Sequence, residues 1–292
     1  MTTKLYIAVN GTCTADPDEH LFEKLGKISA GEVERPYADK LKRTVSGGGT
    51  VLWVKTPSNI FMLDSGDHDD KGILLRSLDV IAKEENLDPQ NSVYAVYSSH
   101  AHGDHNGNHD LFPDAYWMID AKDELFDVIY GVDVKDVGKW AGHREAFKGN
   151  RERGITADKF KRYVTNDHRG KPYRLRIIDT PGHDHVHKSF AIEDDEVVVI
   201  NLETGEEQVT SKAVFTGDCL CDERYLKRFL SDNPETAIYG NAIPLEEWAP
   251  PRNQSERDML DKQNLESMAK LVEEGRDGLL IFGHGGVFDL NS

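Results

Sequence analysis

Four side chains that could bind metal ions lie within six residues of one another. They are His100, His102, Asp104 and His105, in the stretch Ser-Ser-His-Ala-His-Gly-Asp-His-Asn. The segment before them, residues 93–97, has the apolar pattern of a buried strand. Neutral imidazoles suit Zn²⁺ or Fe²⁺, and a carboxylate beside them suits a second ion of the same kind. The stretch therefore predicts a metal site at the end of a strand. A solvated loop that is merely rich in histidine is the alternative, and this density of ligands disfavours it.

The local conformation of this stretch decides which ligands share a side. In an extended chain His100, His102 and Asp104 would project to one side, because side chains alternate along a strand. His105, in the turn that follows, could then reach a neighbouring ion. We expect residues 106–108, Asn-Gly-Asn, to form a turn that leads into a short helix.

Four further short motifs lie elsewhere in the chain. Leu-Asp-Ser-Gly contains Asp64, Thr-Pro-Gly-His ends at His183, Thr-Gly-Asp ends at Asp218, and Gly-His-Gly is centred on His284. Together with the histidine-rich stretch, these motifs resemble, in type and in order, the signature of the metallo-β-lactamase-fold hydrolases. The resemblance extends over about residues 50 to 288.

This resemblance implies an α/β (α+β) fold, a four-layer αββα sandwich with the site at one edge between the sheets. It also implies two divalent metal ions, most naturally Zn, with Fe or Mn as alternatives. By the family pattern, the first ion would be held by His100, His102 and His183, and the second by Asp104, His105 and His284, with Asp218 bridging the two. Asp64 would orient a ligand imidazole or the nearby backbone; equally, it could serve only to stabilise its own turn.

The remaining hydrophobic pattern fits such a sandwich. Strands are predicted over residues 4–9, 51–54, 59–63, 115–119, 173–178, 189–192, 196–200, 212–215 and 279–282, and helices over 73–85 and 252–274. The strands at 51–54 and 59–63 should form a hairpin. We expect one domain over residues 1–292, in which the charged segment 120–170 is an insertion or bridge that could shape the entrance of the site.

Composition restricts the class of partner. The 292 residues carry a formal charge of −17, whereas a nucleic-acid-binding surface needs clustered Lys and Arg. The densest basic group is Arg151, Arg153, Lys159, Lys161 and Arg162. A small-molecule substrate is therefore favoured over nucleic acid. No apolar run approaches the roughly 20 residues of a membrane span, no signal peptide is evident, and three cysteines give no disulfide framework, so we expect a cytoplasmic protein.

The implied chemistry is hydrolysis, because water held by two divalent ions loses a proton near neutral pH. Asp104 and Asp218 would be the carboxylates around the shared hydroxide, and His185 or His187 could donate a proton to the leaving group or contact the substrate, unless both are ordinary exposed loop residues. We favour a small ester, thioester or lactone as substrate.

Two alternatives remain open at this point. A phosphodiesterase or ribonuclease is the first, because residues 102–113 and 283–288 are locally most similar to the group around metallo-β-lactamase domain-containing protein 1, with which RNA cleavage is associated. A non-hydrolytic iron-binding or redox member of the family is the second, since it would use the same ligands.

Overall fold

A computed structural model describes residues 2–11, 48–56, 60–85, 87, 89, 92–100, 102–108, 111–112, 115–118, 175–238 and 254–292. The expected insertion at 120–170, including its basic group, lies outside these residues. The single-domain organisation over residues 1–292 therefore stays a prediction.

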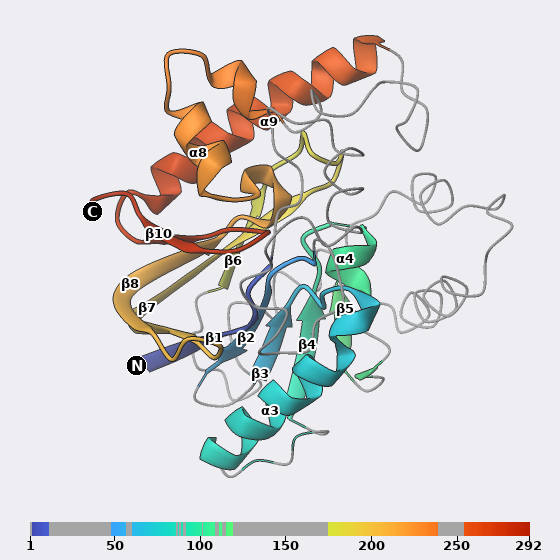
Figure 1. The fold of residues 1–292 in the computed structure, drawn as a ribbon, viewed down its shortest axis with the longest axis vertical. Coiled ribbons are helices and arrows are strands. Elements are labelled where there is room, and N and C mark those ends of the chain that lie inside the picture. Colours follow the sequence, from blue (N-terminus) through green and yellow to red (C-terminus); the bar gives the residue numbers. More distant parts are fainter. Residues whose placement is uncertain are drawn as a thin grey trace, which may run out of the picture.

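The strands within the described segments follow the sequence pattern closely (Figure 1). They are β1 (Thr2–Val9), β2 (Val51–Lys55), β3 (Ile60–Leu63), β4 (Val93–Tyr97), β5 (Tyr116–Met118), β6 (Leu175–Asp179), β7 (Lys188–Asn201), β8 (Glu207–Phe215), β9 (Leu279–Ile281) and β10 (Val287–Asp289). The predicted hairpin is confirmed, because β2 and β3 pair antiparallel. The prediction of separate strands at 189–192 and 196–200 is wrong, because both belong to β7. Its polar residues 193–196 form an irregularity in the pairing with β8 and do not end the strand.

Helical segments connect these strands. They are η1 (His68–Asp70), α3 (Lys71–Glu85), α4 (Gly103–Asn106), η3 (Gly217–Leu220), α8 (Glu223–Phe229), η4 (Pro234–Ala237) and α9 (Gln254–Gly275). The predicted amphipathic helices at 73–85 and 252–274 correspond to α3 and α9. None of the helices in the described segments is long and apolar enough to cross a bilayer.

One long strand joins the two halves of the fold. The strands are hydrogen-bonded in the order β10-β9-β8-β7-β1-β2-β3-β4-β5, and β6 pairs with β7 off this path. The first part of β7 pairs with β6 and the second part with β1, while β8 takes its other edge throughout. The two sheets expected from the sequence are therefore halves of one continuous ladder, folded so that they face each other.

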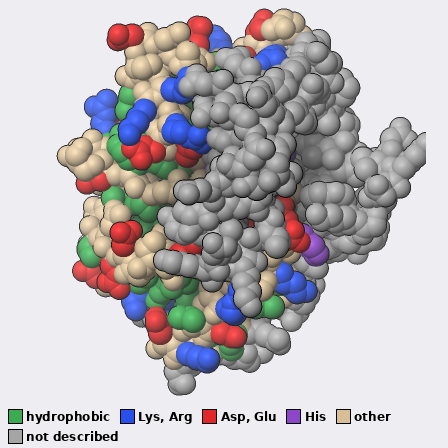
Figure 2. Space-filling view, viewed as in Figure 1, with side chains coloured by type: hydrophobic (Ala, Val, Ile, Leu, Met, Phe, Trp, Pro, Cys, Tyr) green, Lys and Arg blue, Asp and Glu red, His purple; other side chains and the backbone are tan. Residues whose placement is uncertain are grey.

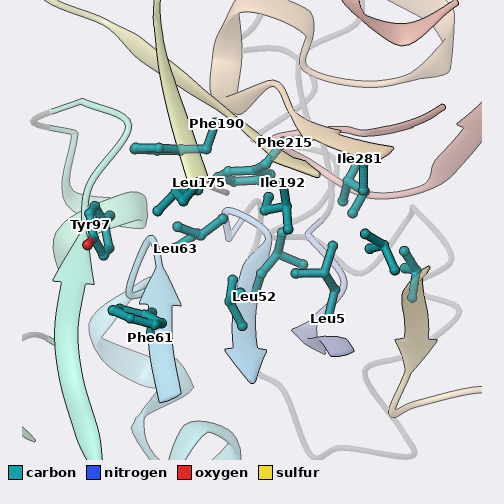
Figure 3. Packing of buried hydrophobic residues seen from close by; sticks show 14 of the residues in the cluster. Leu5, Leu52, Phe61, Leu63, Tyr97, Leu175, Phe190, Ile192, Phe215 and Ile281 are labelled. Carbon is teal, nitrogen blue, oxygen red and sulfur yellow. The ribbon is translucent and has the colours of Figure 1, made fainter. Parts of the chain in front are cut away.

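Three apolar clusters define four layers. Side chains of β1–β4 meet those of β6–β9 in a central core, where Leu52 and Phe61 face Phe190 and Phe215 (Figure 3). The opposite face of β1–β4 packs on α3, and the opposite face of β6–β9 packs on α8 and α9. Alternate residues of each strand supply the two faces, as the pleat requires. The αββα sandwich is thus confirmed.

Acidic and basic side chains interleave over the described surface, as the face in Figure 2 shows. Several of them pair across elements. Arg176 on β6 binds Glu274 of α9 at 2.7 Å and Glu193 of β7 at 2.9 Å, and Lys212 on β8 binds Glu274 at 2.7 Å. These pairs help to hold α9 against the sheet that carries part of the site.

Candidate metal centre

The ligand-rich stretch leaves β4 extended and then turns directly into helix α4. His102 is the N-cap residue, with φ −69° and ψ 147°, and Asp104 and His105 lie within the helix. The predicted alternation through Asp104 and the later helix start are therefore wrong. The Asn106 amide stabilises the turn by donating to the carbonyl oxygens of His100, at 2.5 Å, and His102, at 3.2 Å. A helix here also places the Asp104 carboxylate in a first turn, where it is favoured by the helix dipole.

Seven side chains predicted from the sequence come together at one edge of the sandwich. They form two groups, each with donor atoms within 4.8 Å of one another: His100, His102, His183 and Asp218 in the first, and Asp104, His105 and His284 in the second. His100, His183, Asp218 and His105 are buried, whereas His102, Asp104 and His284 are partly exposed. They come from turns after β4, β6, β8 and β9, so segments distant in sequence build the site.

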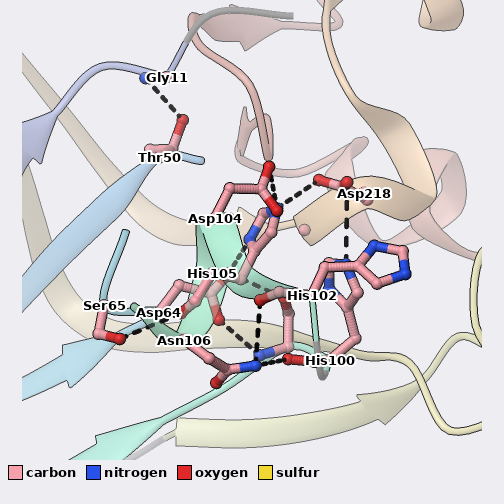
Figure 4. A network of polar contacts seen from close by, with 12 residues as sticks. Gly11, Thr50, Asp64, Ser65, His100, His102, Asp104, His105, Asn106 and Asp218 are labelled. Atoms are coloured by element: carbon pink, nitrogen blue, oxygen red, sulfur yellow. Dashed lines mark hydrogen bonds and ion pairs between the residues drawn. The ribbon is translucent and has the colours of Figure 1, made fainter. Parts of the chain in front are cut away.

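Asp218 lies between the two groups (Figure 4). Its Oδ1 is 3.0 Å from Nε2 of His105 and 3.1 Å from Nε2 of His284. Its Oδ2 is 3.4 Å from Nε2 of His183 and 3.9 Å from Nε2 of His100. Oδ2 is also 3.1 Å from Nε2 of His284, so the carboxylate as a whole approaches histidines of both groups.

The donor atoms fit a bound cation. Nε2 of His100, Nε2 of His105 and Oδ1 of Asp218 are buried and make no hydrogen bond in the structure. The His105 and Asp218 atoms are 3.0 Å apart, the distance of an ion pair. Buried polar atoms are normally satisfied, and imidazole nitrogens with carboxylate oxygens are the ligand types of zinc and related divalent ions. The residues present therefore suit metal ions, without selecting one metal.

Asp64 fixes the orientation of two of these histidines. It follows β3, is fully buried and has a positive φ of 54°. Its Oδ1 accepts from the backbone N–H of Ser99 at 2.6 Å, and its Oδ2 accepts from the Ser99 hydroxyl at 2.8 Å and from Nδ1 of His105 at 2.7 Å. The Ser99 hydroxyl oxygen lies 2.9 Å from Nδ1 of His100 and can accept its proton. A single carboxylate thus places protons on both Nδ1 atoms, which leaves both Nε2 atoms for metal.

The charges within the cluster balance against burial. Burial would lower the pKa of His105, but Asp218, Asp104 and Asp64 together raise it well above its usual value. Burial would raise the pKa of Asp218, but His105 and His284 hold it well below its usual value. By contrast, burial and neighbouring imidazoles lower the pKa of His100 and of His183. The carboxylates therefore favour positive charge between the two groups, which is the charge that a bound cation supplies.

The two histidines after His183 occupy different environments. His187 is fully buried, accepts from the backbone N–H of Asp218 at Nε2 (3.0 Å) and contacts the Thr180 hydroxyl at Nδ1 (2.9 Å). Burial lowers the pKa of His187 to about 4. His185 is partly exposed, and its Nε2 is 2.8 Å from a carboxylate oxygen of Glu256 on α9.

Helix α9 supports the turn that carries His183. Gly182 has a φ of 136°, and a Cβ there would lie 2.3 Å from the backbone of Asn264 on α9. The Ser267 hydroxyl of the same helix donates to the carbonyl oxygen of Pro181 at 2.8 Å. The glycine of the Thr-Pro-Gly-His motif is thus required by a close approach of two backbones.

Sequence reasoning missed the polar side chains that hold the ligands. Ser99 and Thr180 stand inside or beside the recognised motifs, so their hydroxyls could have been found there. Asn106 could have been recognised as a residue that bonds nearby backbone. No comparable signal marks Ser189, whose hydroxyl lies 2.9 Å from that of Thr180.

Comparison with known proteins agrees with this geometry. The family model of the metallo-beta-lactamase superfamily matches residues 46–200, more than half of the chain. No curated protein matched the chain. Among solved structures, a Thermotoga maritima protein described as a metallo-beta-lactamase is 15% identical, with a TM-score of 0.50 over 98% of this chain and 99% of its own.

Two further structures are similar at lower scores. The hydrolase AbOPH of the beta-lactamase superfamily is 18% identical, with a TM-score of 0.45 over 98% of this chain and 88% of its own. AidC, a dizinc quorum-quenching lactonase, is also 18% identical, with a TM-score of 0.44 over 81% of this chain and 72% of its own. The family match over more than half of the chain establishes that this chain belongs to the metallo-beta-lactamase superfamily, and the αββα sandwich and the histidine–aspartate cluster agree with it.

Proposed function

We propose that this protein hydrolyses a small ester, thioester or lactone at a dinuclear metal site. The observation that carries the proposal is the position of Asp218, whose carboxylate oxygens lie within 3.9 Å of histidines from both groups of candidate metal ligands. A carboxylate in that position can bind two ions at once.

The ligand assignment follows the two groups. His100, His102 and His183 would hold the first ion, Asp104, His105 and His284 the second, and Asp218 would be shared. Imidazole-rich groups with few carboxylates favour Zn²⁺, and Fe²⁺ or Mn²⁺ are compatible alternatives.

Two divalent ions bound at this site would lower the pKa of a water molecule from 15.7 towards about 7 and so supply a nucleophile at neutral pH. The residues of this chain prepare the site for that chemistry. Asp64 accepts from Nδ1 of His105 directly and orients His100 through the Ser99 hydroxyl, so that both Nε2 atoms are aimed at the cluster. Partly exposed Asp104 and His102 leave one side of the cluster open to a substrate.

Charge supports an acyl substrate over a phosphodiester. An acyl carbon develops a single oxyanion, whereas a nucleic acid brings formal charge and needs a basic track beyond the metal ions. The chain carries a net charge of −17. Several of the basic side chains that the structure describes, such as Arg176 and Lys212 on the sheet, are paired with carboxylates.

Phosphodiester hydrolysis is the second candidate. It is supported by the local similarity of residues 102–113 and 283–288 to the group around metallo-β-lactamase domain-containing protein 1, with which RNA cleavage is associated. The two candidates differ in their response to salt. Each phosphate neutralised by the protein adds about one unit to the slope of log binding constant against log salt concentration.

Metal analysis combined with a hydrolysis panel tests the proposal. We expect the purified protein to contain about two divalent ions per chain and to hydrolyse at least one class among simple esters, thioesters and lactones. Asp218→Ala should lower metal occupancy and abolish hydrolysis, because the shared ligand is lost. Asp179→Asn, which neutralises an exposed carboxylate at the end of β6, is the matched control and should change neither.

Full two-metal occupancy in Asp218→Ala would contradict the bridging role. Metal-dependent RNA cleavage with a steep salt dependence, and no acyl hydrolysis, would reverse the order of the two candidates.

A further inference from the structure

A closed circuit of hydrogen bonds surrounds the turn that carries Asp218. The backbone N–H of Asp218 donates to Nε2 of His187 at 3.0 Å, and Nδ1 of His187 lies 2.9 Å from the Thr180 hydroxyl. The Thr180 hydroxyl lies 2.9 Å from the Ser189 hydroxyl, which donates to the carbonyl oxygen of Thr216 at 2.8 Å. The circuit therefore begins at the backbone N–H of Asp218 and ends at the backbone carbonyl oxygen of Thr216.

The two ends of the circuit determine the direction of every bond in it. A backbone N–H can only donate, so Nε2 of His187 must accept, and its neutral ring must carry the proton on Nδ1. Thr180 then accepts from Nδ1 and donates to Ser189. Ser189 donates its hydroxyl hydrogen bond to the carbonyl oxygen of Thr216, because a carbonyl oxygen only accepts. Each hydroxyl donates once and accepts once, so the circuit has one consistent arrangement of protons.

The histidine ring also packs against the turn it holds. Gly217, between the two ends of the circuit, has a φ of 53°, and a Cβ at this position would lie 2.7 Å from Nε2 of His187. The side chains of His187, Thr180, Ser189 and Thr216 are fully buried. No water can replace a missing member without a cavity being opened, so the circuit has little freedom to adjust.

We infer that His187 is a positioning residue for the bridging carboxylate, and that it acts as a neutral Nδ1–H imidazole locked by Thr180 and Ser189. The inference rests on the proposed dinuclear function and deepens it. Both ring nitrogens of His187 are already engaged inside the protein. Donating a proton to a leaving group would require the ring to leave its place, so proton donation is not its role.

Two substitutions of His187 separate its two contacts. In His187→Gln the side-chain carbonyl oxygen can take the place of Nε2 and accept from the N–H of Asp218. In His187→Asn the amide nitrogen can take the place of Nδ1 and contact Thr180, but the shorter side chain cannot reach Asp218. Thr180→Ser and Thr180→Val form a second pair, because Ser keeps the hydroxyl and Val keeps the shape without it.

The measurements are metal affinity by chelator competition, thermal unfolding of each variant, and the tautomer of His187 by ¹⁵N NMR of the metal-free protein. We expect His187→Gln and Thr180→Ser to bind two ions within about threefold of the wild type. His187→Asn and Thr180→Val should lose about 10–100-fold in affinity, the range found when a residue that orients a metal ligand is changed. Ser77→Ala, which removes a buried hydroxyl bonded to Trp53 on the opposite layer, controls for the loss of any buried hydroxyl and should keep wild-type affinity.

Equal affinity across both pairs would overturn the inference, as would equal losses within each pair. If the Val or Asn variant fails to fold, the NMR measurement on the wild type still decides. A proton on Nε2 of His187 would overturn the circuit, and a proton on Nδ1 would support it. This measurement needs no metal, so it is independent of the proposed function, which fails separately if the wild type binds no ions.

Discussion

Replacing Asp64 by Asn should weaken metal binding while keeping the shape of the site. Asp64 accepts three hydrogen bonds, one at Oδ1 and two at Oδ2. The Asn oxygen can face the backbone N–H of Ser99, but its NH₂ group then faces Nδ1 of His105. To accept that proton, His105 must move its own proton from Nδ1 to Nε2. The Nε2 atom, which faces Asp218, then carries the proton and cannot bind a metal ion.

The magnitude follows from the nature of these bonds. Loss of a group that orients a metal ligand costs about 10–100-fold in metal affinity, which corresponds to about 1.4–2.7 kcal/mol. The loss should fall mainly on the ion held by Asp104, His105 and His284, because His105 contacts Asp64 directly. His100 contacts it only through Ser99, so the other ion should be affected less.

Chelator competition measures the two affinities. ¹⁵N NMR of the metal-free protein, at a pH at which the His105 ring is neutral, reports which ring nitrogen carries the proton. Asp67→Asn is the matched control, because Asp67 lies on the same turn and caps η1 without contacting a ligand histidine. The reasoning is refuted if Asp64→Asn binds both ions within twofold of the wild type, or if His105 keeps its proton on Nδ1 while affinity falls.

Two further predictions concern the framework of the site. Gly182→Ala should destabilise the fold by about 1–3 kcal/mol from backbone strain and by more from the clash with Asn264, whereas Gly205→Ala, with a φ of 75° and open space around it, should show the strain alone. Urea unfolding of the two variants measures the difference, and equal losses would contradict the close-approach argument. The pKa of Glu274 is held at about 2 by hydrogen bonds from Arg176 and Lys212. The contribution of ionised Glu274 to the free energy of unfolding is therefore complete above the usual carboxyl pKa and is lost as the pH falls towards 2. Glu274→Gln should cost on the order of 1–2 kcal/mol at pH 7, discounted for solvent screening, and almost nothing at pH 2; a cost that does not shrink on acidification would contradict the assignment.

The clustering of the candidate ligands was predictable because their residue types have few other uses in such density. Imidazoles and carboxylates at the ends of buried strands are poor packing residues, and the order of the motifs supplied the partners of the first stretch. The seven side chains that were expected together do lie together. The orienting contact of Asp64 with a ligand imidazole is also present in the structure, so the turn does not exhaust its role.

The local shape of the ligand stretch was not predictable from its spacing. Ligands at alternate positions suit a strand, and a first turn with Asp104 and Asn106 suits a helix equally well. The helix forms because the Asn106 amide satisfies two carbonyl oxygens of the preceding loop, a contact that depends on the folded loop. In the same way, the four polar residues at 193–196 indicate a turn locally, but pairing with β8 on both sides of them keeps β7 continuous.

Burial of His187 was equally invisible, because a histidine in a loop is usually exposed. Its environment is decided by packing against Gly217, which lies 30 residues further along the chain. Long-range pairing explains the continuous ladder as well. Residues 196–201 of β7 pair in parallel with β1, and nothing in either segment identifies the other as its partner.

The arrangement of the candidate ligands would give bound metal ions a structural role as well as a chemical one. His100, His102, Asp104 and His105 belong to the half built from β1–β5, whereas His183, Asp218 and His284 belong to the half built from β6–β10. Each ligand group contains members of both halves, so each ion would join the two sides of the central core. A ligand nitrogen must lose its proton before it can bind an ion, so metal binding, the protonation state of the cluster and the closure of the two halves would be thermodynamically coupled.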